Sequence, residues 1–347
     1  MITRITLGET LHGAGHGKTP AEVKTTILAL ADAAIDLGDL IASGNLRNNL
    51  GAVSSDQNAS GDPQKELDRI ADEMLIDACR GAPVAYVASE ENEAPIVLDR
   101  EAPVAVALDP LDGSSNIDTN ISIGTIFAIY PSRPEGFAEP IDAFLQPGSA
   151  QLAAGFIIYG PQTALVLATT CVEMFIFDRD IGEFIKLTND VAIAHETREY
   201  AVNASNYWQW AMPIRSYIDD CQRGTEGPLH KTFNMRWNAS LVAEAYRILV
   251  RGGIYLYPAD RRTGYESGRL RLIYEANPIA FIIERAQGVA TDGVQRILDI
   301  RPLALHQRTP FVFGTADEVR RVAAYHDDAA NNASRSPLFS PRGLLRA

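Results

Sequence analysis

The chain has 347 residues, of which 46% are hydrophobic and 22% are charged, and its formal net charge at pH 7 is −13. This composition is typical of a folded globular protein with a sizeable core, and it excludes fibrous and largely disordered classes. The acidic balance argues against a nucleic acid or an anionic membrane as partner, because both attract basic surfaces.

The sequence shows no clear membrane-spanning segment, signal peptide or disulfide pattern. No apolar run approaches the ~18 residues of a membrane-spanning helix, and the N-terminus lacks a charged region followed by an apolar one. We therefore expect a cytoplasmic location and no membrane partner. The three cysteines, Cys79, Cys171 and Cys221, are widely spaced and form no CxxC pair, so buried free thiols are expected.

The first predicted elements are helical. Residues 1–18 are expected to be a flexible arm. A capping box beginning at Thr19 starts a helix whose apolar residues recur at helical spacing to about residue 44. A second helix is predicted over 62–81. Asp68 lies off its apolar face, and one interpretation is a solvated surface acid.

Strands dominate the next part of the chain. They are predicted at residues 84–88, 104–108, 121–130, 153–159, 164–168, 172–177 and 183–187. The polar stretch 188–199 is the best candidate boundary, so we place an N-terminal half at 1–196 and a C-terminal half at 197–326. The polar, proline-containing residues 327–347 are expected to form a loose tail.

Helices and strands alternate in the second half. Helices are predicted over 237–250 and 279–287 and from residue 315, with strands at 254–257, 270–274 and 311–313. The predicted fold class is therefore α/β, with alternating helix and sheet layers.

The most informative motif is Asp109-Pro110-Leu111-Asp112-Gly113-Ser114-Ser115-Asn116, which directly follows the buried strand 104–108. Two carboxylates three residues apart at a strand end can point into one site. Magnesium is bound by such oxygens together with substrate phosphate, and the amides and hydroxyls of Gly113, Ser114 and Ser115 could hold that phosphate. The alternative is an ordinary polar turn after a strand.

Further carboxylates strengthen the metal interpretation. Glu90 and Glu91 follow the strand at 84–88. If that strand lies parallel to the strand preceding Asp109, all four carboxylates meet at one edge of the sheet. Glu275 is predicted at a junction between a strand and a helix, where a side chain is held firmly.

These motifs resemble the lithium-sensitive sugar and inositol phosphatase superfamily. The extension Ser122-Ile123-Gly124-Thr125-Ile126-Phe127, together with Tyr274-Glu275-Ala276-Asn277-Pro278 and Gly252-Gly253-Ile254-Tyr255-Leu256-Tyr257, is similar to class I fructose-1,6-bisphosphatases. The resemblance covers about residues 20–325. It implies the sugar phosphatase fold, a homotetramer, and hydrolysis of the 1-phosphate of fructose 1,6-bisphosphate in gluconeogenesis or the Calvin cycle.

The resemblance also implies roles for individual residues. The ligands of two or more Mg²⁺ ions, for which Mn²⁺ may substitute, would be Glu90, Asp109, Asp112, Glu275 and the carbonyl of Leu111. Asp68, Glu91 and Asp112 would be catalytic, with Asp68 and Glu91 sharing a proton as the base for water. The substrate would be bound by Asp112, Gly113, Ser114, Ser115, Asn203, Arg236, Tyr257, Arg269 and Glu275.

Within that set, Asn203, Arg236, Tyr257 and Arg269 would bind the distal phosphate and the sugar, with Arg236 reaching into a neighbouring subunit. The alternative is that Tyr257 is strand core and Arg236 a surface arginine. The family often has tyrosine at the position of Trp237 and lysine at that of Arg269. Bacterial Calvin-cycle relatives carry similar substitutions, so sedoheptulose 1,7-bisphosphate is a possible second substrate.

Two other classes of protein predict motifs that this sequence does not contain. An inositol-phosphatase-like monophosphatase would share the residues from Asp109 to Ser114 but typically carries a later Trp-Asp motif, which the sequence lacks. A non-catalytic calcium-binding module would carry an alternating DxDxDG loop, which is also missing.

Overall fold

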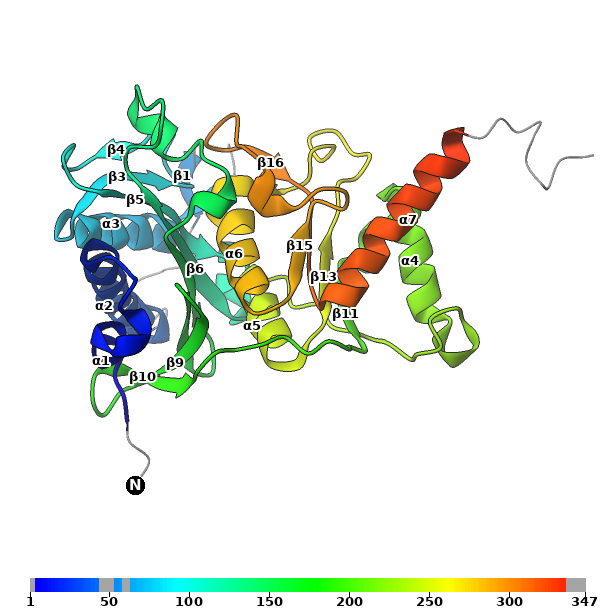
Figure 1. Cartoon of the computed structure of the whole chain (residues 1–347), viewed down its shortest axis with the longest axis horizontal. Coiled ribbons are helices and arrows are strands. Elements are labelled where there is room, and N and C mark those ends of the chain that lie inside the picture. Colours follow the sequence, from blue (N-terminus) through cyan, green and yellow to red (C-terminus); the bar gives the residue numbers. More distant parts are fainter. Residues whose placement is uncertain (1–3, 44–52, 58–62, 335–347) are drawn as a thin grey trace, which may run out of the picture.

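Helices and sheets alternate in layers through the whole molecule (Figure 1). The computed structural model describes residues 4–43, 53–57 and 63–334. Helices α1 (Leu7–His12), α2 (Ala21–Ser43) and α3 (Glu66–Arg80) form the first layer. An eight-stranded sheet, a central pair of helices, a five-stranded sheet and a last helix pair follow in that order. The predicted α/β class with alternating layers is confirmed.

The eight-stranded sheet has the strand order β10-β9-β8-β7-β6-β5-β3-β4. Its strands are β3 (Val84–Ser89), β4 (Ile96–Val97), β5 (Val104–Asp112), β6 (Ile123–Pro131), β7 (Ala153–Tyr159), β8 (Thr163–Ala168), β9 (Val172–Asp178) and β10 (Glu183–Thr188). All pairings are antiparallel except that of β3 with β5, which is parallel. The expectation that these two strands end at one edge is therefore confirmed.

The central helices are α5 (Leu241–Arg251) and α6 (Asn277–Arg285). The five-stranded sheet beyond them contains β12 (Asn234–Met235), β11 (Glu199–Val202), β13 (Ile254–Tyr257), β17 (Phe311–Gly314) and β15 (Val289–Thr291), in that order. Helices α4 (Met212–Gln222) and α7 (Ala316–Ser334) cover its outer face. Two small sheets pair β1 (Val53–Gln57) with β2 (Pro63–Lys65), and β14 (Leu270–Arg271) with β16 (Arg308–Thr309).

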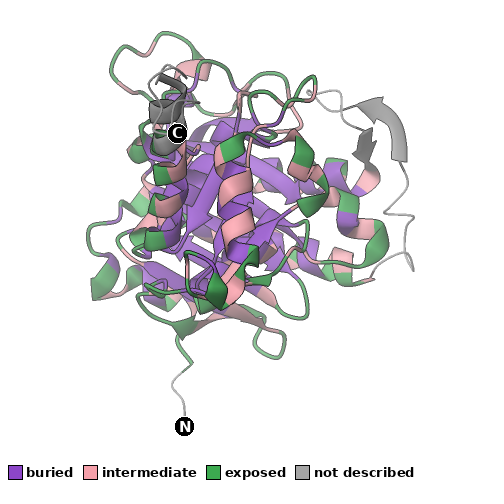
Figure 2. Ribbon diagram, turned by 90° about the vertical axis from the view of Figure 1, so that its right-hand side faces the viewer, coloured by how far each residue is buried: buried purple, intermediate pink, exposed green. Residues whose placement is uncertain are grey.

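Burial follows from this layering (Figure 2). A helix that packs against a sheet on both sides must be apolar nearly all round. Helix α6 meets this requirement, since every residue from Asn277 to Ile283 is buried. The outer helix α3 is amphipathic instead, with Leu67, Ala71 and Leu75 packed against the sheet. Among the described residues, no helix is long and apolar enough to cross a membrane.

Several sequence-based boundaries were wrong. Residues within the predicted flexible arm form α1, because Thr6 and Glu9 make a reciprocal capping box and Leu7 and Leu11 are buried. The helix predicted from residue 62 begins at Glu66. The helix predicted from residue 237 begins only after its cap, Ser240, whose hydroxyl accepts a hydrogen bond from the Ala243 amide.

The strand predicted at 270–274 is also shorter than expected. Only β14 is extended, and a π-helical turn over Leu272–Ala276 follows it and leads into α6. Sequence periodicity does not distinguish a short apolar strand from one buried helical turn. Helix α7 continues to Ser334, and the rest of the predicted tail, 335–347, lies outside the described residues.

Candidate active site

Three buried carboxylates converge at the end of β5. Asp109 and Asp112 belong to that strand, and Glu275 reaches them from the π-helical turn before α6. One carboxylate oxygen of each lies within 4.8 Å of the others. Their residues are only 5%, 8% and 7% exposed, respectively. The structure therefore brings Glu275 to two carboxylates that lie more than 160 positions before it in the sequence.

Glu90 and Glu91 extend this cluster from the neighbouring strand. The Glu90 amide donates to the Leu108 carbonyl at 3.0 Å, which fixes the end of β3 beside β5. The Glu90 carboxylate lies 3.4 Å from the Arg271 Nε. Burial raises the pKa of Asp109 well above its usual range, and Glu90, Asp112, Glu275 and Glu91 raise it further by repulsion.

Burial is also the largest cause of the raised pKa values of the other two members. Burial, followed by repulsion from Glu90 and Asp112, raises the pKa of Glu275 well above its usual range. Burial also raises the pKa of Asp112 to about 6, against the opposing effect of hydrogen bonds from the start of α5. Like charges buried this closely need a cation to stay ionised together.

The donor set identifies the kind of cation. All three convergent groups offer carboxylate oxygens, the ligands that hard divalent ions such as Mg²⁺ and Ca²⁺ prefer, and no thiolate or imidazole belongs to this described cluster. The acidic cluster can thus bind a metal, as the sequence analysis expected.

The turn after Asp112 provides donors for an anion. Gly113 has φ 77°, a left-handed conformation that favours glycine, and Ser114–Thr119 then form a short 3-10 helix. Ser114 is half-buried and Ser115 exposed. The side-chain amide of Asn116 donates to the Ala239 carbonyl at 2.9 Å, so this turn is tied to the residues that precede α5.

Asp68 is not a solvated surface acid. It is 3% exposed on α3, so that interpretation of the sequence was wrong. One turn later on the same face, Asp72 accepts hydrogen bonds from Ser89 Oγ at 2.5 Å and Asn92 Nδ2 at 2.9 Å. Helix α3 is thereby joined to the segment that carries Glu90 and Glu91.

A cavity of about 190 Å³ lies beside the carboxylates. Glu90 and Glu275 line it together with Tyr257 and Arg269. The Arg269 guanidinium lies 5.9 Å from the centre of the Tyr257 ring and 4.5 Å from that of Tyr265. Such stacking orients a guanidinium for an anion.

Two other sequence-predicted binding residues do not line this cavity. The Asn203 side chain caps a short 3-10 helix, where its Oδ1 accepts from the Ser205 amide and hydroxyl at 3.3 Å and 2.6 Å. Arg236 has a half-exposed side chain that contacts Glu199. Their assignment to the distal phosphate remains a prediction.

The cavity is also lined by Tyr265, Arg271 and Arg308, which were not predicted from the sequence. The spacing of Arg269 and Arg271 was an available signal, because residues two apart in an extended segment share one face. Arg308 gave no such signal, since it reaches the site only through the pairing of β16 with β14. Asp72 could have been found from its spacing of four residues after Asp68.

Two family models match almost the whole chain. The fructose-1-6-bisphosphatase N-terminal domain matches residues 3–189, and its C-terminal domain matches residues 193–327. A class 1 fructose-1,6-bisphosphatase of Sinorhizobium medicae is 54% identical over 94% of this chain and 94% of its own length. The class 1 fructose-1,6-bisphosphatase of Azorhizobium caulinodans is 54% identical over 90% of this chain and 96% of its own length.

A solved structure agrees with the sequence relatives. The crystal structure of Leishmania major fructose-1,6-bisphosphatase in holo form has a TM-score of 0.86 to this chain at 31% identity. The match covers 94% of this chain and 99% of that one. Fold and site together thus define a metal-dependent phosphoric monoester hydrolase. More particularly, the chain belongs to the fructose-1,6-bisphosphatase family.

Proposed function

We propose that this chain hydrolyses the 1-phosphate of D-fructose 1,6-bisphosphate to give fructose 6-phosphate and phosphate. The observation that carries the proposal is the cavity that Glu90 and Glu275 line together with Tyr257 and Arg269, beside the cluster of buried carboxylates. A bisphosphate needs a metal centre at the reacting phosphate and a cation at the distal one. A monophosphatase needs only the first.

The metal ligands in this proposal are Glu90, Asp109, Asp112, Glu275 and the Leu111 carbonyl, and they hold two or more Mg²⁺ ions, with Mn²⁺ as a substitute. When bound, these ions supply Lewis acidity that lowers the pKa of water and offsets charge on the leaving oxygen. The repulsion that raises the carboxylate pKa values supports this assignment.

The protein's own groups supply the proton transfer and the phosphate contacts. Asp68 and Glu91 share one proton and together accept the proton of the attacking water. The left-handed turn at Gly113 directs its amide, with Ser114 and Ser115, at the transferred phosphate. Asp112 and Glu275, beside the phosphate, also face the sugar end of the ester.

Distal recognition uses Tyr257 and Arg269 from the cavity wall, together with Asn203 and, from a neighbouring subunit, Arg236. Arg236 extends into the cavity of a neighbouring subunit in a homotetramer. Its exposed position, with a side chain 50% accessible, supports this role. We also propose that the two halves meet near residue 196 and that the enzyme works in the cytoplasm, in gluconeogenesis or the Calvin cycle.

Phosphate release from a panel of substrates tests the proposal. Fructose 1,6-bisphosphate should be hydrolysed with magnesium and not after chelation, whereas inositol 1-phosphate should be a poor substrate. Sedoheptulose 1,7-bisphosphate belongs in the same panel, because it presents two phosphates to the same walls. Equal rates on inositol 1-phosphate would contradict the assignment of a distal phosphate site.

A further inference from the structure

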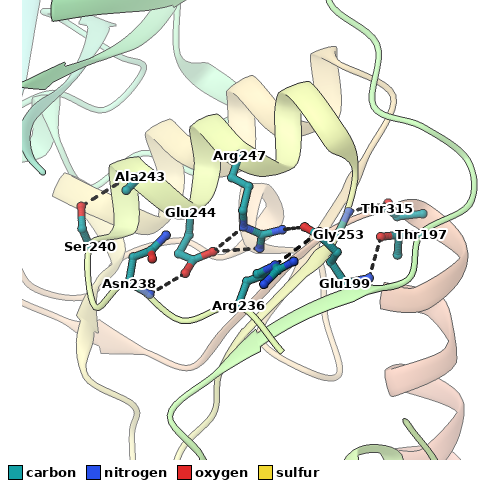
Figure 3. Close-up of polar contacts among 10 residues, drawn as sticks. All are labelled: Thr197, Glu199, Arg236, Asn238, Ser240, Ala243, Glu244, Arg247, Gly253 and Thr315. Carbon is teal, nitrogen blue, oxygen red and sulfur yellow. Dashed lines mark hydrogen bonds and ion pairs between the residues drawn. The ribbon is translucent and has the colours of Figure 1, made fainter. Parts of the chain in front are cut away.

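A chain of ion pairs links α5 to the Arg236 side chain (Figure 3). The Arg247 guanidinium binds Glu244 Oε2 through Nε at 3.0 Å and Nη2 at 2.8 Å. Its third nitrogen, Nη1, lies 2.6 Å from Glu199 Oε2. The Glu244 side chain is fully buried, and those of Arg247 and Glu199 are only 13% and 16% exposed. These contacts are therefore well shielded from water.

Glu199 is shared unequally between two arginines. It is 2.6 Å from Arg247, but its other oxygen is 3.5 Å from Arg236 Nε. The Arg236 backbone is held separately, since its amide donates to the Tyr200 carbonyl at 2.7 Å. The position of the Arg236 main chain thus depends on the sheet, whereas the partner of its guanidinium depends on Glu199.

Glu244 fixes the segment that carries Arg236. Its Oε1 accepts the Asn238 amide at 2.8 Å, while its Oε2 binds Arg247. Burial raises the pKa of Glu244, and the neighbouring Arg247 opposes that shift. Glu244 therefore anchors the loop before α5 and also holds Arg247, which competes with Arg236 for the Glu199 carboxylate.

The charge balance explains what this arrangement does. Two arginines and two glutamates sum to zero whichever contacts form, so the degree to which Arg236 is neutralised depends on how closely Glu199 approaches it. Arg247 contacts both glutamates. Its forked guanidinium is the only side-chain type that can bind two carboxylates in this way with fixed geometry.

From this we propose that Arg247 is a positioning residue for the distal phosphate: it engages Glu199 and so keeps the Arg236 guanidinium available to an anion. This inference rests on the proposed function, in which Arg236 binds that phosphate. Without Arg247, the Glu199 carboxylate closes on Arg236 as an ion pair and competes directly with substrate.

A charge-neutral double variant tests the inference. Glu244→Gln with Arg247→Met removes one charge of each sign, which replaces a buried ion pair without leaving either partner uncompensated. We expect KM for fructose 1,6-bisphosphate to rise about tenfold, with kcat unchanged. Adding Glu199→Gln to this variant should return KM to near its original value, because the competing carboxylate is gone.

Controls separate positioning from a structural role. Glu199→Gln alone should not raise KM, and thermal melting should show that each variant is folded. If the double variant does not fold, Arg247→Lys retains a cation beside Glu244 without the fork, and its smaller rise in KM should again be reversed by Glu199→Gln. A rise in KM that Glu199→Gln fails to reverse would overturn the inference.

The unmodified enzyme and Arg236→Ala complete the experiment. If the unmodified enzyme does not hydrolyse the bisphosphate, the proposed function fails and the inference falls with it. If it does and Arg236→Ala raises KM while the double variant keeps the original KM, only the role of Arg247 is refuted. If Arg236→Ala leaves KM unchanged, the distal role of Arg236 is wrong, and the inference is overturned for that reason.

Discussion

The Val242 amide donates a hydrogen bond to the Asp112 carboxylate at 3.0 Å, although 130 positions separate the two residues. Val242 lies in the first turn of α5, where the helix dipole favours a negative charge. This bond lowers the pKa of Asp112 against the larger, opposite effect of burial. The start of α5 thus helps to hold a candidate metal ligand at the end of β5 in its ionised form.

Gly124 makes this contact possible. It pairs with Asp112 across β5 and β6, and a Cβ at Gly124 would lie 2.3 Å from the Ile157 carbonyl oxygen and 2.6 Å from Val242 Cγ2. Gly124→Ala should therefore displace the start of α5 and cost ~1 to 3 kcal/mol of unfolding free energy. Turnover should fall with it.

Chemical denaturation and the phosphate-release assay measure both effects. Gly15→Ala is the matched control, because a Cβ there meets nothing within 4 Å. If Gly124→Ala had the stability and turnover of the control variant, the packing of α5 against the sheet would not constrain the site.

Asp109→Asn tests the metal centre. The substitution removes one charge from a cluster whose members raise each other's pKa, so it should weaken ion binding and abolish most turnover. With a chelator present, the variant should be at least as thermally stable as the unmodified protein, because a buried repulsion is relieved. A folded variant that turned over at a near-normal rate in saturating magnesium would contradict the assignment.

Arg236→Ala tests the distal phosphate. Loss of a charge-assisted hydrogen bond should weaken binding of the bisphosphate by ~1.5 to 3 kcal/mol and so raise its KM. The KM of phosphate esters that lack a second phosphate should change little. Arg179→Ala is a suitable control, since that arginine is 60% exposed and pairs with Asp39. Equal losses on both substrate types would show that Arg236 has a structural role.

His306 should make stability depend on pH. Burial lowers the pKa of His306 below its ordinary value of 6.5, while its Nε2 lies 3.0 Å from the Asn92 carbonyl oxygen. Because the unfolded chain binds this proton more readily, the contribution to stability is present above pH 6.5 and is lost as the pH falls from there through the lower pKa of the folded state.

Thermal melting between neutral pH and pH values below 6.5 provides the measurement. His306→Gln should remove part of the acid-induced loss of Tm, because it retains a hydrogen-bond donor but does not titrate. An unchanged pH profile in this variant would show that other groups account for the whole loss.

Much of the fold followed from local patterns in the sequence. The strand at Ala153–Tyr159 was predicted to the residue, because its apolar run has the length of a strand and ends at Gly160-Pro161. The N-terminal arm was misjudged since its order comes from distant partners. His16, for example, is buried with its Nε2 2.7 Å from Glu173 Oε2, 157 positions away.

The candidate site also combines residues that local sequence patterns predicted with contacts that they did not. Asp109 and Asp112 could be predicted from their spacing directly after a strand. The parallel pairing of β3 with β5 brings Glu90 and Glu91 to the same edge of the sheet. The ion pair between Glu199 and Arg247 had no sequence signal. It joins β11 to α5 across 48 positions, and only the packing of helix on sheet determines such a contact.

The most direct test of the account is hydrolysis of fructose 1,6-bisphosphate in water enriched in heavy oxygen, with magnesium present. We predict fructose 6-phosphate as the sugar product and heavy oxygen in the released phosphate, because water attacks the phosphorus of the 1-phosphate. Fructose 1-phosphate as product, or heavy oxygen at the C1 hydroxyl of the sugar, would contradict this mechanism, whereas the C2 oxygen exchanges with water in any case.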